Sequence, residues 1–582
     1  MIAAALHGAL PWRNPVFVRF WRSRLRLRRS VFWYLLTLIV TTFIVTLTYI
    51  VQTNTGTPPQ DAARSLWIPL LIIQGLILMF KGTGSVAAGL IQDKIDQTLD
   101  YQRLTPVAPL RNLLGYLFGL PVLEYVMFAL TLPHLAFVVV VGNVPVATLI
   151  SVYFSFFVCV VLYHMTGIAA GMVMRRWIWG YMLSILLVLV VNVILPTFIA
   201  QLGLKFFQYL SVWPVIGQKV LPLIVPESAI AGVTSRNPYF ATSGDVPFFN
   251  WTLSPFVFTL LLQGALIATF GTMAHRRWKS STRHSLSKGY ALGFLAGFIV
   301  VLIGNVWPII TRQYMPFALF GERNLENLGE VVAIGLPLVY VYVVWLLCIV
   351  LFSIVIPTHH SYVRGIRRAM KLGRPAARML DDDAGTVSFY AIFTAVAVGG
   401  FAVLFNEISV AGFLEPFGEA EHFWRLPVVF ALVLFYTALL LQALGGRPTV
   451  LVVLLLWFLP ILAAIVVSAA QSNFGMAQSV IGSFSPIAVV FASGMLPLGA
   501  FEMGADRELS AALVGANVGL AVLVVQIAAL WLHWNRRRRE YDALCRAREE
   551  SHSAEIDEKE LRDVVEDVLG AAPEPVNEAA RS

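Results

Sequence analysis

The sequence contains few charged residues and few cysteines. Of its 582 residues, 13% are charged and 58% are hydrophobic, and this balance excludes an ordinary soluble domain. The three cysteines, Cys159, Cys348 and Cys545, are far apart and fall in apolar runs or in a basic tail. They exclude a disulfide framework and a zinc site, and we expect no metal centre in the chain.

Signatures of catalysis are also missing. The sequence has no Gly-x-x-x-x-Gly-Lys-Ser/Thr phosphate loop, and the dipeptide Gly-Lys does not occur at all, so this device for binding ATP is excluded. Neither His-Glu-x-x-His nor Gly-x-Ser-x-Gly occurs. The adjacent His359 and His360 have no partner cluster, and we interpret them as a solvated pair. We expect a protein that is not an enzyme and that binds no cofactor of its own.

Basic residues outnumber acidic ones, and the formal net charge is +9. This charge could suggest nucleic-acid binding, but the arginines lie beside apolar segments, where the positive-inside rule of membrane proteins explains them more simply. With the N-terminus in the cytoplasm, 34 of the 42 Lys and Arg fall on cytoplasmic segments. We therefore expect no nucleic-acid partner, and a multi-pass protein of the bacterial inner membrane with both termini cytoplasmic.

Long apolar runs dominate the chain, and about 20 apolar residues are needed to cross a bilayer as a helix. Twelve runs meet this requirement. The first run has no small-residue cleavage site after it, so we expect a retained helix rather than a signal peptide. The predicted spans are residues 31–51, 66–82, 114–141, 147–172, 178–200, 253–274, 289–308, 331–356, 387–407, 427–444, 449–470 and 513–535.

The loops between these spans repeat their order of lengths in two successive groups of six helices. In each group a long cytoplasmic loop follows the second helix, at 83–113 and 357–386, and a short one follows the fourth. We therefore predict an all-α membrane fold built from two parallel six-helix halves. The predicted parts are an interfacial helix at 1–30, halves at 31–275 and 289–535, a linker at 276–288 and a tail at 536–582.

Each half also has a long external segment before its last helix. Within these segments, residues 211–223 (SVWPVIGQKVLPL) and 483–498 (SFSPIAVVFASGMLPL) share Ser-x-x-Pro followed by Leu-Pro-Leu. Both are apolar, yet too short and too broken by proline to span the bilayer. They predict re-entrant or interfacial turns, and the alternative is two unrelated proline-rich loops.

The two ends of the chain differ in character. Residues 13–29 mix seven arginines with aromatic and aliphatic residues, which predicts a helix at the cytoplasmic interface in contact with anionic headgroups. The tail from Glu540 carries thirteen acidic and five basic residues. We expect a short helix at 554–570 and disorder after it.

Polar groups at membrane depth are costly and therefore mark candidate functional residues. The strongest candidate is Glu124 in the third predicted helix, and His134, His164 and Asn192 are the others. A proton relay would need several facing carboxylates, and Glu124 is nearly alone. Two interpretations stay open: a substrate or proton site, and a structural carboxyl hydrogen-bonded near a turn loosened by Pro121.

The loop at 89–115 is a patterned polar hairpin between two apolar segments. Read as a helix, it offers a partial apolar stripe, while Lys94, Asp100 and Arg103 point elsewhere. Thr105 can begin a turn, and Pro106 is tolerated in the first turn of the next helix. The sequence predicts an amphipathic elbow at the cytoplasmic surface, and an ordinary solvated loop is the alternative. The stripe consists of Ile91, Ile95, Leu99 and Leu104.

The same loop resembles that of the type-2 ABC permeases, the membrane subunits of ATP-driven exporters. Their loop after the second helix commonly reads acid-basic, Gly-Thr-Leu-Glu, Leu-x-x-Thr-Pro and then Gly-Lys or similar at the start of the third helix, although no Lys follows Gly115 here. The matching residues here are Asp93-Lys94, Thr98-Leu99-Asp100, Leu104-Thr105-Pro106 and Leu114-Gly115. Residues 14–26 also resemble the Asn-Pro-Val opening and arginine-rich helix of such permeases. Gln97 stands in place of the motif's Gly, and the loop at 357–386 lacks both Thr-Leu and Thr-Pro.

The resemblance implies a separate ATPase partner that uses ATP and Mg²⁺ and docks on the elbow. Its closure would rock the two halves and move a substrate outward, and nothing in the sequence names that substrate. The implied coupling residues are Asp93, Lys94, Thr98, Leu99, Arg103, Leu104, Thr105 and Pro106.

Two other classes of protein stay open. A major-facilitator secondary transporter also has twelve helices in two parallel halves, and Gly89, Asp93 and Lys94 match the beginning of its loop motif. Asp96 and Gln97 break that motif, and the long external segments are foreign to that family. The third class is a membrane scaffold that transports nothing.

Overall fold

The computed structural model places most of the chain in helices. It describes residues 14–105, 107–174, 176–199, 204–225, 245–280, 284–311, 329, 331–374, 379–385, 387–415, 423–445, 449–470, 475–502 and 506–570. The predicted coupling residue Pro106, the predicted disordered end after 570 and the first thirteen residues therefore lie outside the described residues.

Within the described residues, eleven helices are long and apolar enough to cross a membrane, as expected of a multi-pass all-α membrane protein. The predicted eleventh span, 449–470, forms helix α23 (Thr449–Ala470), and within its described side chains the apolar stretch runs over Leu455–Val467. The twelve-helix, two-half arrangement therefore stays a prediction.

The chain divides into two compact units, each described here by itself. The first contains Met1–Leu286, Tyr290–Val344 and Gly399–Gly418, and the second Ser287–Gly289, Trp345–Val398 and Glu419–Ser582. Three helices contribute to both: α19 (Leu336–Val355), α21 (Val387–Val410) and α16 (Lys288–Ile310), the last with only its first two residues in the second unit.

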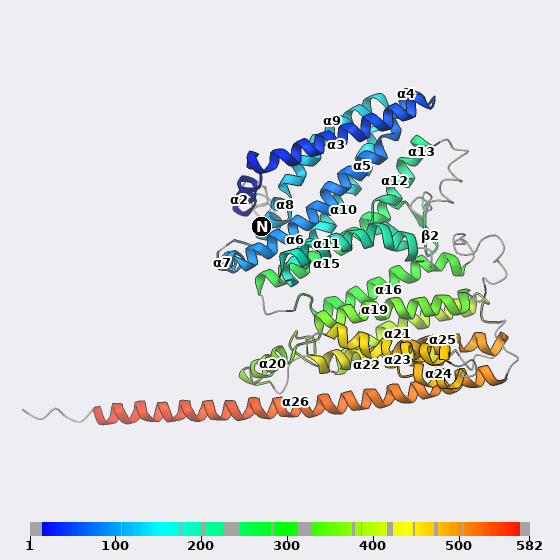
Figure 1. Ribbon diagram of the computed structural model, residues 1–582. Coiled ribbons are helices and arrows are strands. Elements are labelled where there is room, and N and C mark those ends of the chain that lie inside the picture. The colour runs from blue at the N-terminus through cyan, green and yellow to red at the C-terminus, as the bar shows by residue number, and fades with distance from the viewer. Residues whose placement is uncertain are drawn as a thin grey trace, which may run out of the picture. The chain divides into compact units, whose positions relative to one another are not determined.

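The first unit holds the elements from α2 to η6 (Figure 1). Their bounds are α2 Pro15–Arg24, α3 Leu27–Asn54, α4 Pro59–Ser65, α5 Trp67–Gly75, η2 Leu76–Gly82, α6 Thr83–Ile95, α7 Thr98–Leu104, α8 Pro109–Gly119, α9 Val122–Val141, α10 Val146–Val173, α11 Trp177–Leu189, η3 Val190–Ile199, η5 Lys205–Leu210, α12 Trp213–Lys219, α13 Leu221–Ile224, β1 Val246–Phe248, β2 Trp251–Leu253, α15 Pro255–Lys279, α16 Lys288–Ile310 and η6 Val331–Gly335.

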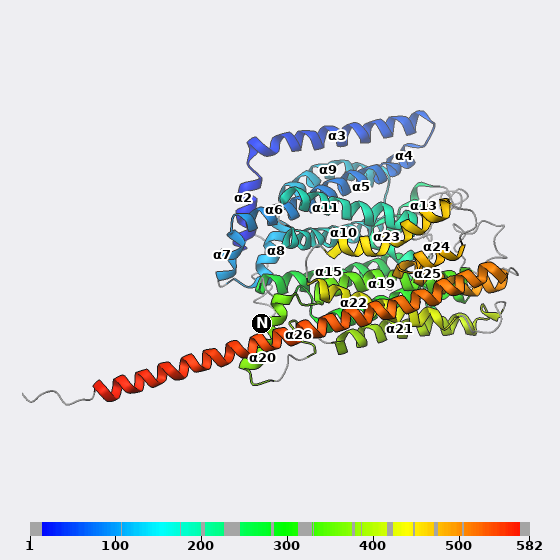
Figure 2. The same ribbon diagram turned by 60° about the horizontal axis from the view of Figure 1, so that its bottom comes forward.

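The second unit holds the remaining helices besides its shares of α19 and α21. Their bounds are α20 His359–Lys371, α22 Arg425–Leu444, α23, α24 Gly475–Gly482, α25 Pro486–Glu502 and α26 Asp506–Gly570. The last of these is one continuous helix of 65 residues (Figure 2), so the helix expected at 554–570 is the end of α26 rather than a separate element.

Two predicted spans differ from the observed helices. The second continues well beyond 66–82, because α4, α5, η2 and α6 form one long run from Pro59 to Ile95. The third is broken between α8 and α9 at Leu120 and Pro121. Proline lacks the N–H that continues a helix, which explains a break at this position.

Helix α10 is the centre of the first unit and packs against α6, α11 and α15. Its buried face includes Phe156, Cys159, Val160 and Tyr163, which join the larger apolar core of this unit. A second apolar cluster forms where α2, α8 and the end of α15 meet, around Phe20, Tyr116 and Trp278.

Both Ser-x-x-Pro segments form helices with the motif proline in the first turn: α12 begins one residue before Pro214, and α25 begins at Pro486. The first gives α12 and α13, which are far too short to span a bilayer, and α12 packs on α10 and α15. The second gives α25, which packs on α22 and α26. In each case the neighbours are the fourth and the last predicted helix of the same half. Their entry into the bilayer stays a prediction.

Candidate functional site

The elbow after the second span is a helix break followed by one short helix. Helix α6 ends at Ile95, and Gln97 adopts a left-handed backbone with φ of 57° before α7 begins. Such a φ is unfavourable for any residue with a Cβ and is adopted readily by glycine. This explains why the resembling loop motif has Gly at the position of Gln97, and it places α7 at the end of α6 (Figure 2).

Asp93 anchors the base of the elbow to α2 and α8. Its Oδ2 accepts from the Arg19 guanidinium of α2, and from the Tyr116 hydroxyl of α8 at 2.5 Å. Burial raises the pKa of Tyr116, and the neighbouring Asp93 carboxylate raises it further, so the hydroxyl stays protonated as a donor. Asp93 therefore joins three elements of the first unit.

Lys94 and Arg103 anchor the elbow to two further helices. The Lys94 ammonium donates to the carbonyl of Met172 at 3.0 Å and to that of Met174 at 3.4 Å, at the end of α10. Arg103 pairs with Asp100 at 2.6 Å and donates to the carbonyl of Arg277 in α15 at 3.2 Å. Cations favour the free carbonyls at helix C-termini. These predicted coupling residues thus bind the chain's own helices.

The other residues of the elbow divide into a buried and an exposed set. Leu99 is buried, and the Thr105 hydroxyl donates to the carbonyl of Gln102 at 2.7 Å, while Thr98 is half-buried. Leu104 and Tyr101 are 85% and 71% exposed. Because the break at Gln97 turns α7 relative to α6, the predicted stripe does not stay on one side: Ile91 and Leu99 are buried, and Ile95 and Leu104 are exposed.

The two segments that resemble the permease family meet in space. The Asn14 side chain caps α2 by accepting from the Val16 N–H at 3.0 Å, and its amide donates to the Arg111 carbonyl at 2.6 Å. A Cβ added at Gly115 of α8 would lie 2.8 Å from the Val16 Cβ and 2.9 Å from the Asn14 amide. Only glycine fits at Gly115, so the Asn-Pro-Val opening and the end of the elbow form one contact.

Glu124 is buried and paired with a lysine that the sequence analysis gave no role. Lys81 of η2 forms an ion pair with the Glu124 Oε1, which also accepts from the Ser85 hydroxyl at 2.8 Å. The Lys81 ammonium lies 4.8 Å from the centre of the Trp33 ring. The Glu124 Oε2 has no hydrogen-bond partner within the described part of the chain. This buried charge pair is typical of a functional site in a membrane protein.

His164 joins the same region from α10. Its Nε2 lies 3.0 Å from the carbonyl of Leu78 in η2, and its Nδ1 lies 3.4 Å from the Tyr125 hydroxyl. A Cβ at Gly82 would lie 2.7 Å from the His164 Nε2, so the ring packs directly on the helix backbone. The π-helical geometry of η2, which is frequent at functional sites, therefore places Lys81 and the Leu78 carbonyl beside Glu124 and His164.

The other two predicted polar residues lie elsewhere. The His134 Nε2 is 3.0 Å from the Thr42 hydroxyl of α3. Asn192 of η3 donates to the Tyr163 hydroxyl at 2.8 Å and to the Val188 carbonyl at 3.0 Å. The structure therefore places Glu124 and His164 on either side of η2 in one region, and His134 and Asn192 elsewhere with partners of their own. The i,i+4 spacing of Lys81 and Ser85 could have placed these two on one helix face, but it does not indicate that Glu124 lies beside them.

The loop of the second unit at 357–386 has a different character. Its helix α20 packs on α26 through aromatic contacts: the His359 and Tyr362 rings lie 6.3 Å and 5.2 Å from that of Trp534. The prediction of a solvated histidine pair is thus wrong for His359, which packs against Trp534. Arg368 pairs with Asp383 at 3.1 Å on the exposed side.

Within the described residues, no group of three or more His, Cys, Asp or Glu is placed to hold a metal ion. No protein-family model, no curated protein and no solved structure matches this chain.

Proposed function

We propose that this chain is the membrane-spanning permease subunit of an ATP-driven exporter of the type-2 ABC class. A separate ATPase subunit supplies the ATP and Mg²⁺ chemistry, and the chain lies in the bacterial inner membrane with both termini in the cytoplasm. One observation carries the proposal: the elbow exposes apolar side chains on α7 while its base is bonded to α2, α8, α10 and α15.

The exposed part of α7 suits a protein partner. Ile95, Tyr101 and Leu104 are 54%, 71% and 85% exposed and follow one another around a single turn-and-helix segment. Interface cores are enriched in aromatic residues and depleted of charge. Asp93, Lys94 and Arg103 have internal partners, so we assign them to positioning the elbow rather than to contacting the ATPase.

The anchored base explains how a displacement of α7 would be transmitted. The segment from α6 to α7 is held to four neighbouring helices by charge-assisted hydrogen bonds. It should therefore move together with those helices rather than bend away alone. Leu99 of α7 is itself buried and adds a packed contact at the same place. A nucleotide-driven movement of the partner at α7 would thus shift α6 and α10, the most closely packed helices of the unit.

The test is co-purification of the full chain from its native membrane after mild cross-linking. We expect a phosphate-loop ATPase to be recovered with the wild-type chain, and its ATP hydrolysis to respond to the chain. The double variant Y101S/L104S should lose this ATPase. The matched control W251S changes an equally exposed aromatic residue on β2 and should keep it.

Recovery of equal ATPase with Y101S/L104S would contradict the elbow assignment, and recovery of no ATPase with any variant would contradict the class. An ATPase that binds but does not respond to the chain would indicate a scaffold. Substituted-cysteine labelling near residues 101 and 536 from each side of the membrane checks the proposed orientation.

A secondary transporter is the second candidate, because the buried Lys81–Glu124 pair is a typical element of proton-coupled carriers. Proteoliposomes with the purified chain alone and an internal pH-sensitive dye separate the two. Proton flux that disappears in E124Q would favour the carrier. Absence of flux in the wild type, together with a recovered ATPase, supports the exporter.

A further inference from the structure

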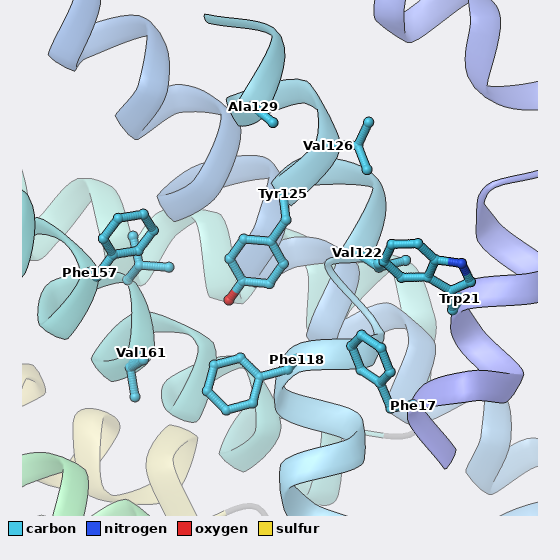
Figure 3. Close-up of a pocket in the computed structure, with 10 residues that line it drawn as sticks. Phe17, Trp21, Phe118, Val122, Tyr125, Val126, Ala129, Phe157 and Val161 are labelled. Atoms are coloured by element: carbon cyan, nitrogen blue, oxygen red, sulfur yellow. The ribbon is translucent and has the colours of Figure 1, made fainter. Parts of the chain in front are cut away.

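An apolar groove lies between α2, α9 and α10 of the first unit, and Phe118 of α8 lines it as well. Its volume is about 530 Å³, within the usual range for small-molecule sites. Figure 3 shows aromatic side chains from the three helices around one space: Trp21 from α2, Tyr125 from α9 and Phe157 from α10. Val126 and Ala129 extend the lining along α9 into a membrane-spanning segment.

The walls of this groove are apolar apart from the Trp21 indole N–H and the Tyr125 hydroxyl. The one hydroxyl among the lining side chains belongs to Tyr125 and is already engaged with His164 at 3.4 Å. Phe17 and Trp21 of α2 lie next to each other at one end, with ring centres 5.9 Å apart. The groove therefore suits a flexible hydrocarbon chain, and its lining would not bind the polar headgroup of such a ligand.

A polar headgroup could instead be recognised by the arginines after Trp21, two at the end of α2 and one at the N-cap of α3. Arg22, Arg24 and Arg26 follow within five residues, and none has an ion-pair or hydrogen-bond partner for its guanidinium among the described residues. The acidic residue that could have neutralised this end, Asp93, is occupied by Arg19 and Tyr116. Helical spacing puts Arg24 on the same face of α2 as Phe17 and Trp21.

We propose that this groove binds one acyl chain of an anionic membrane phospholipid, with the lipid phosphate held by Arg22, Arg24 and Arg26. Charge complementarity decides the class of lipid: unpaired guanidiniums bind phosphate strongly and bidentately, and a cluster of them prefers a headgroup with net negative charge. The proposal concerns the first unit alone and does not depend on the ATPase partner.

Photo-cross-linking tests the proposal on the full chain in nanodiscs. The probe is phosphatidylglycerol with a diazirine on its acyl chain, and phosphatidylethanolamine with the same chain is the comparison. We expect peptides around Phe118, Tyr125 and Phe157 to be labelled by the anionic probe at least about fivefold more than by the zwitterionic one, since one arginine contact contributes a factor of this size.

Two variants distinguish binding of the lipid acyl chain from binding of the lipid headgroup. A129W fills the groove and should abolish labelling by both probes, whereas L261W adds the same ring at an exposed position of α15 and should leave it intact. The triple change R22Q/R24Q/R26Q should remove the preference for phosphatidylglycerol. Size-exclusion profiles and thermal unfolding verify that each variant is folded.

Three results would overturn the proposal. The first is equal labelling by both lipids in the wild type, and the second is undiminished labelling in folded A129W. The third is a protein–protein cross-link at the same peptides, which would show that a second copy of the chain covers the groove.

Discussion

The two long loops that follow the second helix of each predicted half are built on different physical principles. The first, which contains α7, is held by charged hydrogen bonds: Asp93 to Arg19 and Tyr116, and Lys94 to the end of α10. The second, which contains α20, is held by ring packing of His359 and Tyr362 on Trp534. Each loop is firmly attached to its own unit, but by a different interaction.

The surfaces that the loops expose differ as well. The elbow exposes Tyr101 and Leu104, and its cations are engaged internally. Helix α20 instead exposes Arg367, Arg368 and Lys371. An apolar exposed face suits a packed protein contact, whereas a basic one suits acidic side chains or anionic headgroups. This difference favours one ATPase-contacting elbow of the proposed kind rather than two alike.

Removal of the ring that holds the second loop should have the largest effect. Trp534 is buried against His359 and Tyr362, so W534A leaves a cavity and should lower the free energy of unfolding by about 3 kcal/mol or more. The measurement is chemical unfolding in detergent, with limited proteolysis of 357–386. W531A, on an exposed face of the same helix, is the control and should change stability by less than about 1 kcal/mol. Equal effects of the two variants would contradict ring packing as the attachment.

Loss of the carboxylate that holds the elbow should come next. D93A removes the acceptor of both Arg19 and Tyr116 and should cost about 2 kcal/mol, since each hydrogen bond involves a charged group in a partly buried place. Hydrogen exchange of the α7 amides should rise in D93A and stay unchanged in W534A. D96A alters an exposed carboxylate on the same loop and should be nearly neutral. If D96A destabilised as much as D93A, the anchoring role of Asp93 would be wrong.

The sequence predicted the positions of these loops better than their attachments. Apolar run lengths located eleven spans, because length and hydropathy are local properties. The role of Asn14 as a helix cap could also be anticipated, because Asn is a preferred N-cap residue and it directly precedes Pro15 at the start of α2. The elbow was predicted as a polar hairpin for the same reason: its charges and prolines lie in one short segment.

The pairs that define the site could not be predicted in this way. Arg19 meets Asp93 and Lys81 meets Glu124 only after α2, η2, α6 and α9 pack together, and no local pattern joins residues so far apart in the chain. The π-helical turn of η2 has no distinct composition either. Glu124 was therefore predicted as nearly alone, although Lys81 lies beside it.

Substitution of the strained residue of the elbow should change the free energy of unfolding less than D93A does, and in the opposite direction. Gln97 has a left-handed backbone, so Q97G should stabilise the chain by about 1 kcal/mol by removing the Cβ clash. The same substitution five residues earlier, Q92G, falls inside α6 and should destabilise by about the same amount. The measurement is the free energy of unfolding of both variants. Two shifts of the same sign would show that Gln97 is not strained.

The smallest effect is expected at the ion pair of the second loop. Arg368 is 66% exposed on the side chain, and its pairing with Asp383 is open to solvent and salt. Exposed pairs contribute little, so R368Q should lower the free energy of unfolding by less than about 0.5 kcal/mol, and about 0.5 M salt should remove even that difference. R19Q, which disturbs the partly buried Asp93 pair, should keep most of its larger effect in the same salt. If salt erased both effects equally, the elbow would be held no more firmly than the surface of α20, and the contrast between the two loops would rest on Trp534 alone.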